Sequence, residues 1–209
     1  MEKELSHQEK ISYLPPAGKH WLLPLYDPLS RLFGIDAYRD RCLKQANLAS
    51  HHYVLDVGCG TGSLMEAIVQ GYPFECLFGV DPDDNALRFA VRKLRRTSNV
   101  QIKSGFADQL DFPDHFFHRV FSTFVFHHLT RQEQVRTLTE ICRVLKPGGL
   151  FNLLDFDHWN PHKHGRSNRS AHPSPAYAQL LKQCGFTLLR ERKERHLFLG
   201  RISFFVASI

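Results

Sequence analysis

The sequence has no long apolar run: none of its stretches approaches the roughly 20 consecutive apolar residues that a membrane-spanning helix needs. The first ten residues are polar and carry charges of both signs, which argues against a secretory leader. The five cysteines include no C-x-x-C pair, so no zinc framework is expected, and their odd number and scatter are typical of a reducing compartment. These absences predict a cytoplasmic protein without a membrane span.

A strong excess of one charge is also missing. The chain has 27 Lys and Arg against 21 Asp and Glu, a formal charge of +6, and its 13 histidines would raise this charge only in mild acid. The balance indicates an ordinary solvated surface, with an acidic or phosphorylated substrate as the alternative, and no nucleic-acid partner is expected. No repeat or low-complexity block interrupts the 209 residues, a length that suits one domain with a substantial core.

The most informative segment that is present is a glycine-rich turn between a strand and a helix. Residues 54–57, Val-Leu-Asp-Val, form a short apolar run typical of a buried parallel strand. Gly58, Gly60 and Gly62 follow at alternating positions, and the residues from Ser63 onward predict a helix. Such a turn lets the backbone approach a ligand where no Cβ is in the way. The alternative is a tight turn without a ligand.

The residues around this turn indicate which ligand it suits. A dinucleotide-binding turn, G-x-G-x-x-G, would have its third glycine where this chain has Ser63. Asp56, inside the end of the strand, would repel a pyrophosphate but would suit an ammonium or sulfonium group. In these respects the chain resembles the class I S-adenosylmethionine-dependent methyltransferases, whose first motif is an acidic, glycine-rich turn of this kind.

A second predicted strand, residues 74–81, ends in a carboxylate. Asp81 follows Asp56 by 25 residues, close to the ~20-residue offset expected for an acid that binds ribose in a βαβ unit. The resemblance implies that Asp81 accepts both ribose hydroxyls, and the alternative is an N-cap for the following helix. Pro82 ends the strand, and the helix that starts near Asn85 has a basic face that we expect to be solvated.

The next two predicted strands lead to further site residues. A strand at residues 100–103 precedes Asp108, and the resemblance implies that this acid contacts the adenine amino group. A buried strand at about residues 119–124 follows. Its start contains His118 and Arg119, where the family has an aspartate. We expect this departure to alter the start of the strand without affecting the cofactor.

The rest of the chain continues to alternate between helices and strands. Apolar residues at helical spacing predict a helix over residues 130–145, which a Lys-Pro-Gly-Gly segment terminates. A fifth strand is expected at residues 150–156, a helix from residue 175 to a C-cap glycine at 185, and two last strands at 188–194 and 202–207.

These elements predict an α/β fold, a Rossmann-like three-layer α/β/α sandwich with a mostly parallel seven-stranded sheet and an antiparallel C-terminal hairpin. Residues 1–209 are interpreted as one methyltransferase domain. Within it, residues 1–45 form an N-terminal lid and residues 46–209 the cofactor-binding core. For the apolar strip of the lid, packing against the edge of the domain is the alternative.

The resemblance places S-adenosyl-L-methionine across the carboxyl ends of the first, second and fourth strands. The residues that it implies for cofactor binding are Tyr26, Asp56, Gly58, Cys59, Gly60, Asp81, Pro82, Ala107, Asp108, Ser122 and Thr123. His127 and His128 follow the fourth strand beside the expected methyl group, so either could act as a general base. The alternative is that one of them packs or caps the next helix. Histidines at positions 158, 162 and 164 have no cysteine or acidic pair to complete a metal site, so no metal is predicted.

The predicted function is S-adenosylmethionine-dependent methyl transfer to a small-molecule acceptor by in-line displacement. The Tyr26-Asp27 pair is similar to a Tyr-Asp pair of the ubiquinone/menaquinone-biosynthesis-type methyltransferases. Three alternatives remain open: a cofactor-binding protein without transfer activity, a methyltransferase acting on a protein or nucleic acid, and an enzyme that uses a nicotinamide dinucleotide. The sequence is compatible with a monomer or a homodimer.

Overall fold

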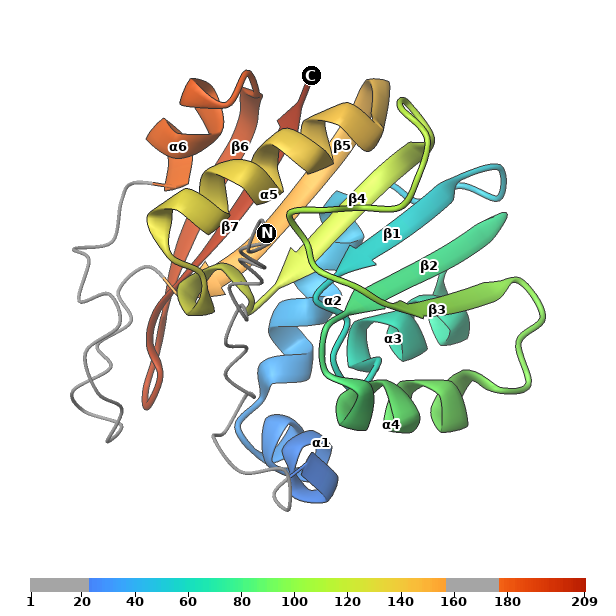
Figure 1. Cartoon of the computed structure of the whole chain (residues 1–209). Coiled ribbons are helices and arrows are strands. Elements are labelled where there is room, and N and C mark those ends of the chain that lie inside the picture. Colours follow the sequence, from blue (N-terminus) through green and yellow to red (C-terminus); the bar gives the residue numbers. More distant parts are fainter. Residues whose placement is uncertain (1–22, 157–176) are drawn as a thin grey trace, which may run out of the picture.

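A single seven-stranded sheet organises the described part of the chain (Figure 1). The computed structural model describes residues 23–156 and 177–209. The strands lie in the order β3-β2-β1-β4-β5-β7-β6, and neighbouring strands are parallel except where β7 pairs with β5 and β6. This confirms the predicted Rossmann-like sandwich with an antiparallel C-terminal hairpin.

The first half of the chain builds one side of the sheet. Its elements are α1 (Leu23–Leu32), α2 (Ile35–Gln45), β1 (Tyr53–Val57), α3 (Ser63–Gly71), β2 (Cys76–Asp81), α4 (Asp84–Leu94) and β3 (Val100–Ser104). The apolar strands β1 and β2 are buried over nearly their whole length. Helix α4 starts where it does because the Asp83 carboxylate accepts hydrogen bonds from the backbone N–H groups of Asn85 and Ala86. Asp83 is therefore the N-cap, and the N-cap interpretation of Asp81 is wrong.

The second half of the chain builds the other side. Its elements are β4 (Phe117–Thr123), the short 3-10 helix η2 (Phe126–His128), α5 (Arg131–Val144), β5 (Leu145–Phe156), α6 (Tyr177–Gln183), β6 (Thr187–His196) and β7 (Gly200–Ser208). A capping box starts α5: the Thr130 hydroxyl accepts a bond from the Glu133 backbone N–H, and the Glu133 carboxylate accepts one from the Thr130 N–H.

The start of β5 differs from the prediction, which placed it at residue 150. Leu145 already pairs with Phe117 of β4, and the next pair joins Leu150 to Arg119. The Lys-Pro-Gly-Gly segment between the two pairs is therefore an irregularity within the β4–β5 ladder, and no loop separates α5 from the strand.

His118 and Arg119 stand where the family that this sequence resembles has an aspartate. Both side chains form hydrogen bonds that fix the start of β4 to neighbouring segments. His118 Nδ1 accepts the Tyr53 backbone N–H at 3.0 Å, and Arg119 Nε donates to the Ala46 carbonyl at 2.6 Å. Both bonds lie at the amino ends of β1 and β4, away from the glycine turn. The departure thus concerns the start of the strand, as the sequence predicts.

Helices cover both faces of the sheet and divide the core in two (Figure 1). On one face α2, α3 and α4 pack in a cluster that includes Leu43, Met65 and Leu87. On the other face α5 and α6 contribute Ile141 and Leu181 to a second cluster. None of the helices within residues 23–156 and 177–209 has both the length and the apolar character to cross a membrane.

The strand order reverses between β1 and β4, and this reversal positions the site. From β1 the chain moves outward to β2 and β3, and it then returns to the other side of β1 and moves the opposite way through β4 and β5. Ligands of open α/β sheets bind at such a reversal, outside the carboxyl ends of the strands. The carboxyl ends of β1, β2, β4 and β5 are called the carboxyl edge below.

Candidate functional site

The turn between β1 and α3 has three glycines with left-handed backbone, at φ 77° for Gly58, 52° for Gly60 and 77° for Gly62. A Cβ on Gly58 would lie 2.3 Å from Val125 Cγ2, and one on Gly62 would lie 2.9 Å from Ala90 Cβ. These two glycines therefore let neighbouring segments approach the turn. A Cβ on Gly60 would meet no heavy atom of the described residues within 4 Å. Gly60 borders open space, as a position beside a ligand requires.

Asp81, at the end of β2, is tied to this turn. Its Oδ2 accepts the Gly60 backbone N–H at 2.8 Å, and its Oδ1 accepts the Asp83 N–H at 2.9 Å. Burial raises the pKa of Asp81, and the two backbone N–H groups oppose that rise. Because a carboxylate has about four acceptor positions, both oxygens keep capacity for further donors. The geometry is compatible with the predicted contact to two ribose hydroxyls.

Asp56 is a buried carboxylate at the end of β1. It is 1% exposed, and its Oδ1 has no hydrogen-bond partner among the described residues. Burial is the main reason that the pKa of Asp56 rises to about 7, and Asp81 adds to the rise while Arg39 opposes it. The Ser122 hydroxyl, buried near the end of β4, also has no partner within the described part of the chain. Such unpaired buried oxygens fit the cationic amino-acid portion of the predicted cofactor.

A His-Asp pair lies at the carboxyl edge on the other side of β1. His127, in η2, has its Nδ1 2.6 Å from Asp155 Oδ1, and its backbone N–H donates to Asp155 Oδ2 at 3.2 Å. Asp155 is fully buried near the end of β5, and the His127 side chain is 4% exposed. The ring of His128 lies 3.9 Å from that of His127, and Phe156 packs edge-on at 4.9 Å. Of the two predicted histidines, His127 is oriented by a carboxylate.

Asp155 is a site residue that the sequence analysis missed. It ends an apolar strand, as Asp56 and Asp81 do, so the same signal was present. The missing information was that η2 and the end of β5 meet, although 28 residues separate His127 from Asp155.

Asp27 was also missed, although the sequence analysis singled out the Tyr26-Asp27 pair. Its Oδ1 accepts hydrogen bonds from Thr61 Oγ1 at 2.7 Å and from Ser63 Oγ at 2.6 Å, and its Oδ2 lies 2.8 Å from Lys93 Nζ. Burial raises the pKa of Asp27, but the bonds from Lys93, Ser63 and Thr61 outweigh burial and hold it below its usual value. Helix α1 is thereby attached to the glycine turn.

The other predicted contacts differ in what surrounds them. Asp108 forms an ion pair with Arg136 of α5 at 2.9 Å, so a contact with adenine would share this carboxylate, and the adenine role stays a prediction. The Cys59 thiol is buried, and burial, with Asp56 and Asp81, raises its pKa well above the usual value. Cys59 is therefore a neutral thiol at pH 7 and is no nucleophile.

Three predicted features lie wholly or partly outside what the structure describes. Tyr26 falls within α1, but its side chain is outside the described part, as are the lid residues before 23 and the histidines at 158, 162 and 164. Within residues 23–156 and 177–209, no three His, Cys, Asp or Glu side chains are grouped so that they could hold a metal ion.

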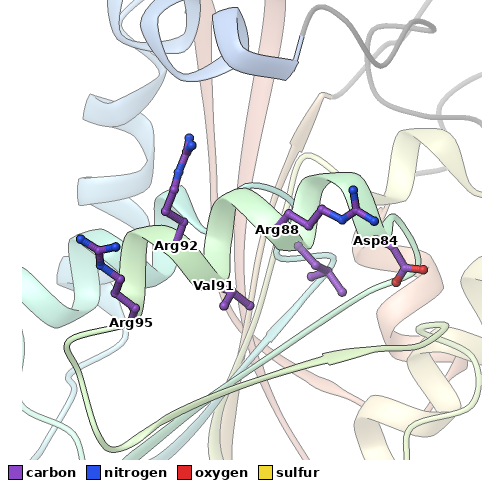
Figure 2. A pocket seen from close by; sticks show the side chains of 6 residues that line it. Asp84, Arg88, Val91, Arg92 and Arg95 are labelled. Carbon is purple, nitrogen blue, oxygen red and sulfur yellow. The ribbon is translucent and has the colours of Figure 1, made fainter.

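A shallow pocket lies along α4 (Figure 2). It is lined by Asp84, Leu87, Arg88, Val91, Arg92 and Arg95. Its arginines are exposed, as predicted for the basic face of this helix. Lys93 is the exception: its side chain is only 16% exposed and pairs with Asp27, so the expectation that it is solvated was wrong.

Comparisons with known proteins agree with this geometry. A family model described as a methyltransferase domain matches residues 54–149. The ubiquinone/menaquinone biosynthesis C-methyltransferase UbiE of Cupriavidus taiwanensis is 30% identical over 164 residues, which are 73% of this chain and 67% of that protein. A demethylmenaquinone methyltransferase of Staphylococcus saprophyticus is 34% identical over 137 residues, 62% of this chain and 57% of that protein. The chain spans little more than half the length of such demethylmenaquinone methyltransferases.

The fold also matches solved structures. A crystal structure described as a SAM dependent methyltransferase from Aquifex aeolicus superposes with a TM-score of 0.70 at 21% identity, over 91% of this chain and 98% of that one. At this identity the match shows a shared fold.

Proposed function

The chain belongs to the class I S-adenosylmethionine-dependent methyltransferases, and from this premise we propose that it transfers the methyl group of S-adenosyl-L-methionine to a small-molecule acceptor. The observation that carries the proposal is the His127–Asp155 pair. It lies at the carboxyl edge, where η2 follows β4, the strand next to β1, and meets the end of β5. The five cysteines are free thiols, which supports a cytoplasmic location.

Cofactor binding is assigned to the carboxyl ends of β1, β2 and β4. Asp56, whose Oδ1 has no hydrogen-bond partner among the described residues, would accept the ammonium group, and Asp81 would accept the ribose hydroxyls. The open side of Gly60 would adjoin the methionine portion. The remaining contacts are assigned to Tyr26, Gly58, Cys59, Pro82, Ala107, Asp108, Ser122 and Thr123.

The bound cofactor would supply an electrophilic methyl group on a positively charged sulfur, which leaves as a neutral thioether. The protein then has two tasks, to align the acceptor with that methyl group and to exclude water. The attachment of α1 to the glycine turn through Asp27 supports a role for the N-terminal lid in the second task.

His127 is assigned the role of general base. Because the Asp155 carboxylate accepts a hydrogen bond, the proton of the neutral ring lies on Nδ1, and Nε2 is the nitrogen that can take a proton. As the new bond to the methyl carbon forms and the carbon–sulfur bond breaks, the acceptor would lose its proton to Nε2. Asp155 would stabilise the resulting imidazolium and keep the ring in this orientation.

The proposal is tested by following a radiolabelled methyl group. The protein is incubated with S-adenosyl-L-[methyl-³H]methionine and, in turn, a short-chain demethylated naphthoquinol, a catechol and a phenol, since the names of the relatives point to quinols. Label should enter one of these acceptors and not the protein or added tRNA. Labelling only of protein or tRNA, or cofactor binding without any transfer, would contradict the proposal and favour the alternatives.

Asp81→Ala is expected to weaken S-adenosylhomocysteine binding by roughly 10- to 100-fold. A hydrogen bond to a charged group contributes about 1.5–3 kcal/mol, and the substitution also removes the partner of the Gly60 N–H. Calorimetric titration measures the effect. Asp84→Ala, which removes an exposed carboxylate three residues away, is the control and should bind like the wild type. If Asp81→Ala and Asp84→Ala bind equally well, Asp81 is not part of the site.

Affinity for S-adenosylhomocysteine is expected to rise with pH up to about 7. Burial raises the pKa of Asp56 to about 7 in the unliganded chain, whereas the ammonium group of the ligand favours the ionised carboxylate. Binding below pH 7 must therefore release a proton, which costs up to about tenfold in affinity per pH unit.

For folding, the raised pKa of Asp56 means that the native chain binds more protons than the unfolded chain between pH 3.8, the ordinary pKa, and about pH 7. The Asp56 contribution to stability therefore falls as pH rises through this window.

Titration calorimetry at about pH 5.5, 6.5 and 7.5 measures this dependence. Asp56→Asn, which cannot ionise, should lose the slope. A slope that persists in Asp56→Asn would assign the proton to another group, such as Asp81.

A further inference from the structure

Helix α1 exposes an apolar stripe. Its members recur at positions i, i+4 and i+7 and continue just past the helix: Leu25 (48% exposed), Leu29 (45%), Leu32 (78%) and Phe33 (42%). At 100° per residue, Asp27 and Ser30 lie on the opposite side of the helix, where they bond to the glycine turn and to Arg39. A surface helix normally turns its apolar stripe toward the core. The described side chains that attach helix α1 to the domain, Asp27 and Ser30, are polar instead.

The tip of the β6–β7 hairpin extends this apolar stripe. Leu197 and Phe198 are 86% and 74% exposed, and the Phe198 ring lies 6.3 Å from that of Phe33. His196 holds the tip in place: its Nε2 donates to the Phe33 carbonyl at 2.8 Å, and its Nδ1 accepts the backbone N–H groups of Phe198 and Leu199 at 3.1 Å. The two segments therefore form one surface. This apolar surface consists of Leu25, Leu29, Leu32, Phe33, Leu197 and Phe198.

Large exposed apolar side chains are concentrated here. Among the described residues ten such side chains are exposed, and six of them belong to the apolar surface, whereas the other four come from separate elements. Scattered exposed apolar residues are normal, but a contiguous group on the surface marks an interaction site.

The apolar surface lies at the same end of the molecule as the candidate active site. Ile202 of β7 pairs with Phe156 at the carboxyl end of β5, so the preceding hairpin tip projects past the carboxyl edge. Figure 1 shows this tip extending beyond the ends of the neighbouring strands. On the other side, α1 is bonded to the glycine turn through Asp27.

Basic residues lie on the two segments that carry the apolar surface and on the neighbouring helix α4. Residues 187–201, which contain the hairpin tip, include five Lys and Arg but only two Glu. Arg31, on α1, has a side chain that is 67% exposed. Helix α4, which adjoins α1 through the Lys93–Asp27 ion pair, adds Arg88, Arg92 and Arg95, and Figure 2 shows the Arg92 side chain extending toward α1.

We propose that the apolar surface docks on an anionic lipid bilayer, and that a lipophilic acceptor enters the carboxyl edge from that bilayer. Leucine and phenylalanine side chains on an amphipathic helix, next to Lys and Arg, are the composition of segments that lie in the membrane interface. The basic residues complement anionic headgroups. The acceptor class rests on the proposed function, whereas the docking itself does not.

Vesicle flotation of the full chain tests the proposal. The vesicles contain either phosphatidylcholine alone or phosphatidylcholine with about a third phosphatidylglycerol, at low and at high salt. The wild type should float with the anionic vesicles and lose most of this binding at high salt. The double variant Leu32→Glu/Phe198→Glu, whose sites are both exposed, should bind at least tenfold less. Leu189→Glu is the matched control, since Leu189 is 56% exposed at the other end of β6, and it should bind like the wild type.

Two further measurements make the outcome decisive. Sedimentation without lipid should give the same mass for the wild type and the double variant. A dimeric wild type together with a monomeric double variant would instead assign the surface to a second copy of the chain. S-adenosylhomocysteine binding should be unchanged in the double variant. A wild type that fails to float with anionic vesicles, or a double variant that floats equally well, overturns the docking. If docking fails but S-adenosylhomocysteine still binds, the proposed function stands. If the chain binds vesicles but not S-adenosylhomocysteine, the proposed function alone is overturned.

Discussion

Replacing Gly60 by valine is expected to weaken S-adenosylhomocysteine binding by roughly 100-fold or more, about 3 kcal/mol, in a protein that still folds. The added side chain would fill the open space that borders the turn at this position. A β-branched residue also resists the left-handed backbone, at φ 52°, that presents the Gly60 N–H to Asp81. Both effects act on the ligand side of the turn. Titration calorimetry measures the affinity, and thermal melting checks that the variant is folded.

The chain offers a matched control for this experiment. Gly148 also has a left-handed backbone, at φ 73°, and a Cβ there would meet no described heavy atom within 4 Å. It lies near the amino end of β5, away from the carboxyl edge. Gly148→Val should therefore reproduce the backbone strain, of about 1–2 kcal/mol, without any loss of affinity. Equal affinities for Gly60→Val and the wild type would make the glycine turn purely structural.

His127→Ala is expected to lower kcat by about 10²- to 10⁴-fold, the usual contribution of a general base, while S-adenosylhomocysteine affinity changes little. Asp155→Asn should lower kcat by about 10²-fold, because an amide cannot accept from every donor that now faces this carboxylate: the His127 ring and the backbone N–H groups of His127 and Phe156. Transfer to the acceptor identified by labelling provides kcat.

His128→Ala is the control for the base, since its ring lies beside that of His127 and the sequence made the two histidines equivalent candidates. It should retain kcat within about threefold. Because Asp155 is fully buried, each variant is also tested for a cooperative thermal transition. If Asp155→Asn does not fold, the activity of His127→Ala alone tests the assigned base. A His128→Ala variant that loses more activity than His127→Ala would contradict the assigned base.

Features set by neighbouring residues could be predicted from the sequence. The buried strand β1, the glycine turn after it and the Thr130 start of α5 follow from apolar runs, glycine spacing and capping chemistry, which act over a few residues. The mostly parallel sheet with its antiparallel C-terminal hairpin was predicted with the help of the resemblance to a family, but the order of the strands was not, because no local pattern states which strands become neighbours.

Features that depend on that order could not be read from the pattern. The orientation of His127 by Asp155 requires η2 to meet the end of β5, and the attachment of α1 requires Asp27 to reach Thr61, 34 residues away. The same holds for the early start of β5, which the pairing of Leu145 with Phe117 extends beyond the Lys-Pro-Gly-Gly segment. In each case a contact between distant residues decides the role of a side chain whose sequence neighbours are uninformative.

Titration of the 209-residue chain with S-adenosylhomocysteine and, separately, with NAD tests the central claim most directly. The claim is that the glycine turn, Asp56 and Asp81 form the binding site of a methyltransferase cofactor. The expected result is saturable binding of one S-adenosylhomocysteine per chain, no binding of NAD, and a higher melting temperature with S-adenosylhomocysteine. A chain that melts cooperatively but binds no S-adenosylhomocysteine, or that binds NAD instead, would contradict the claim.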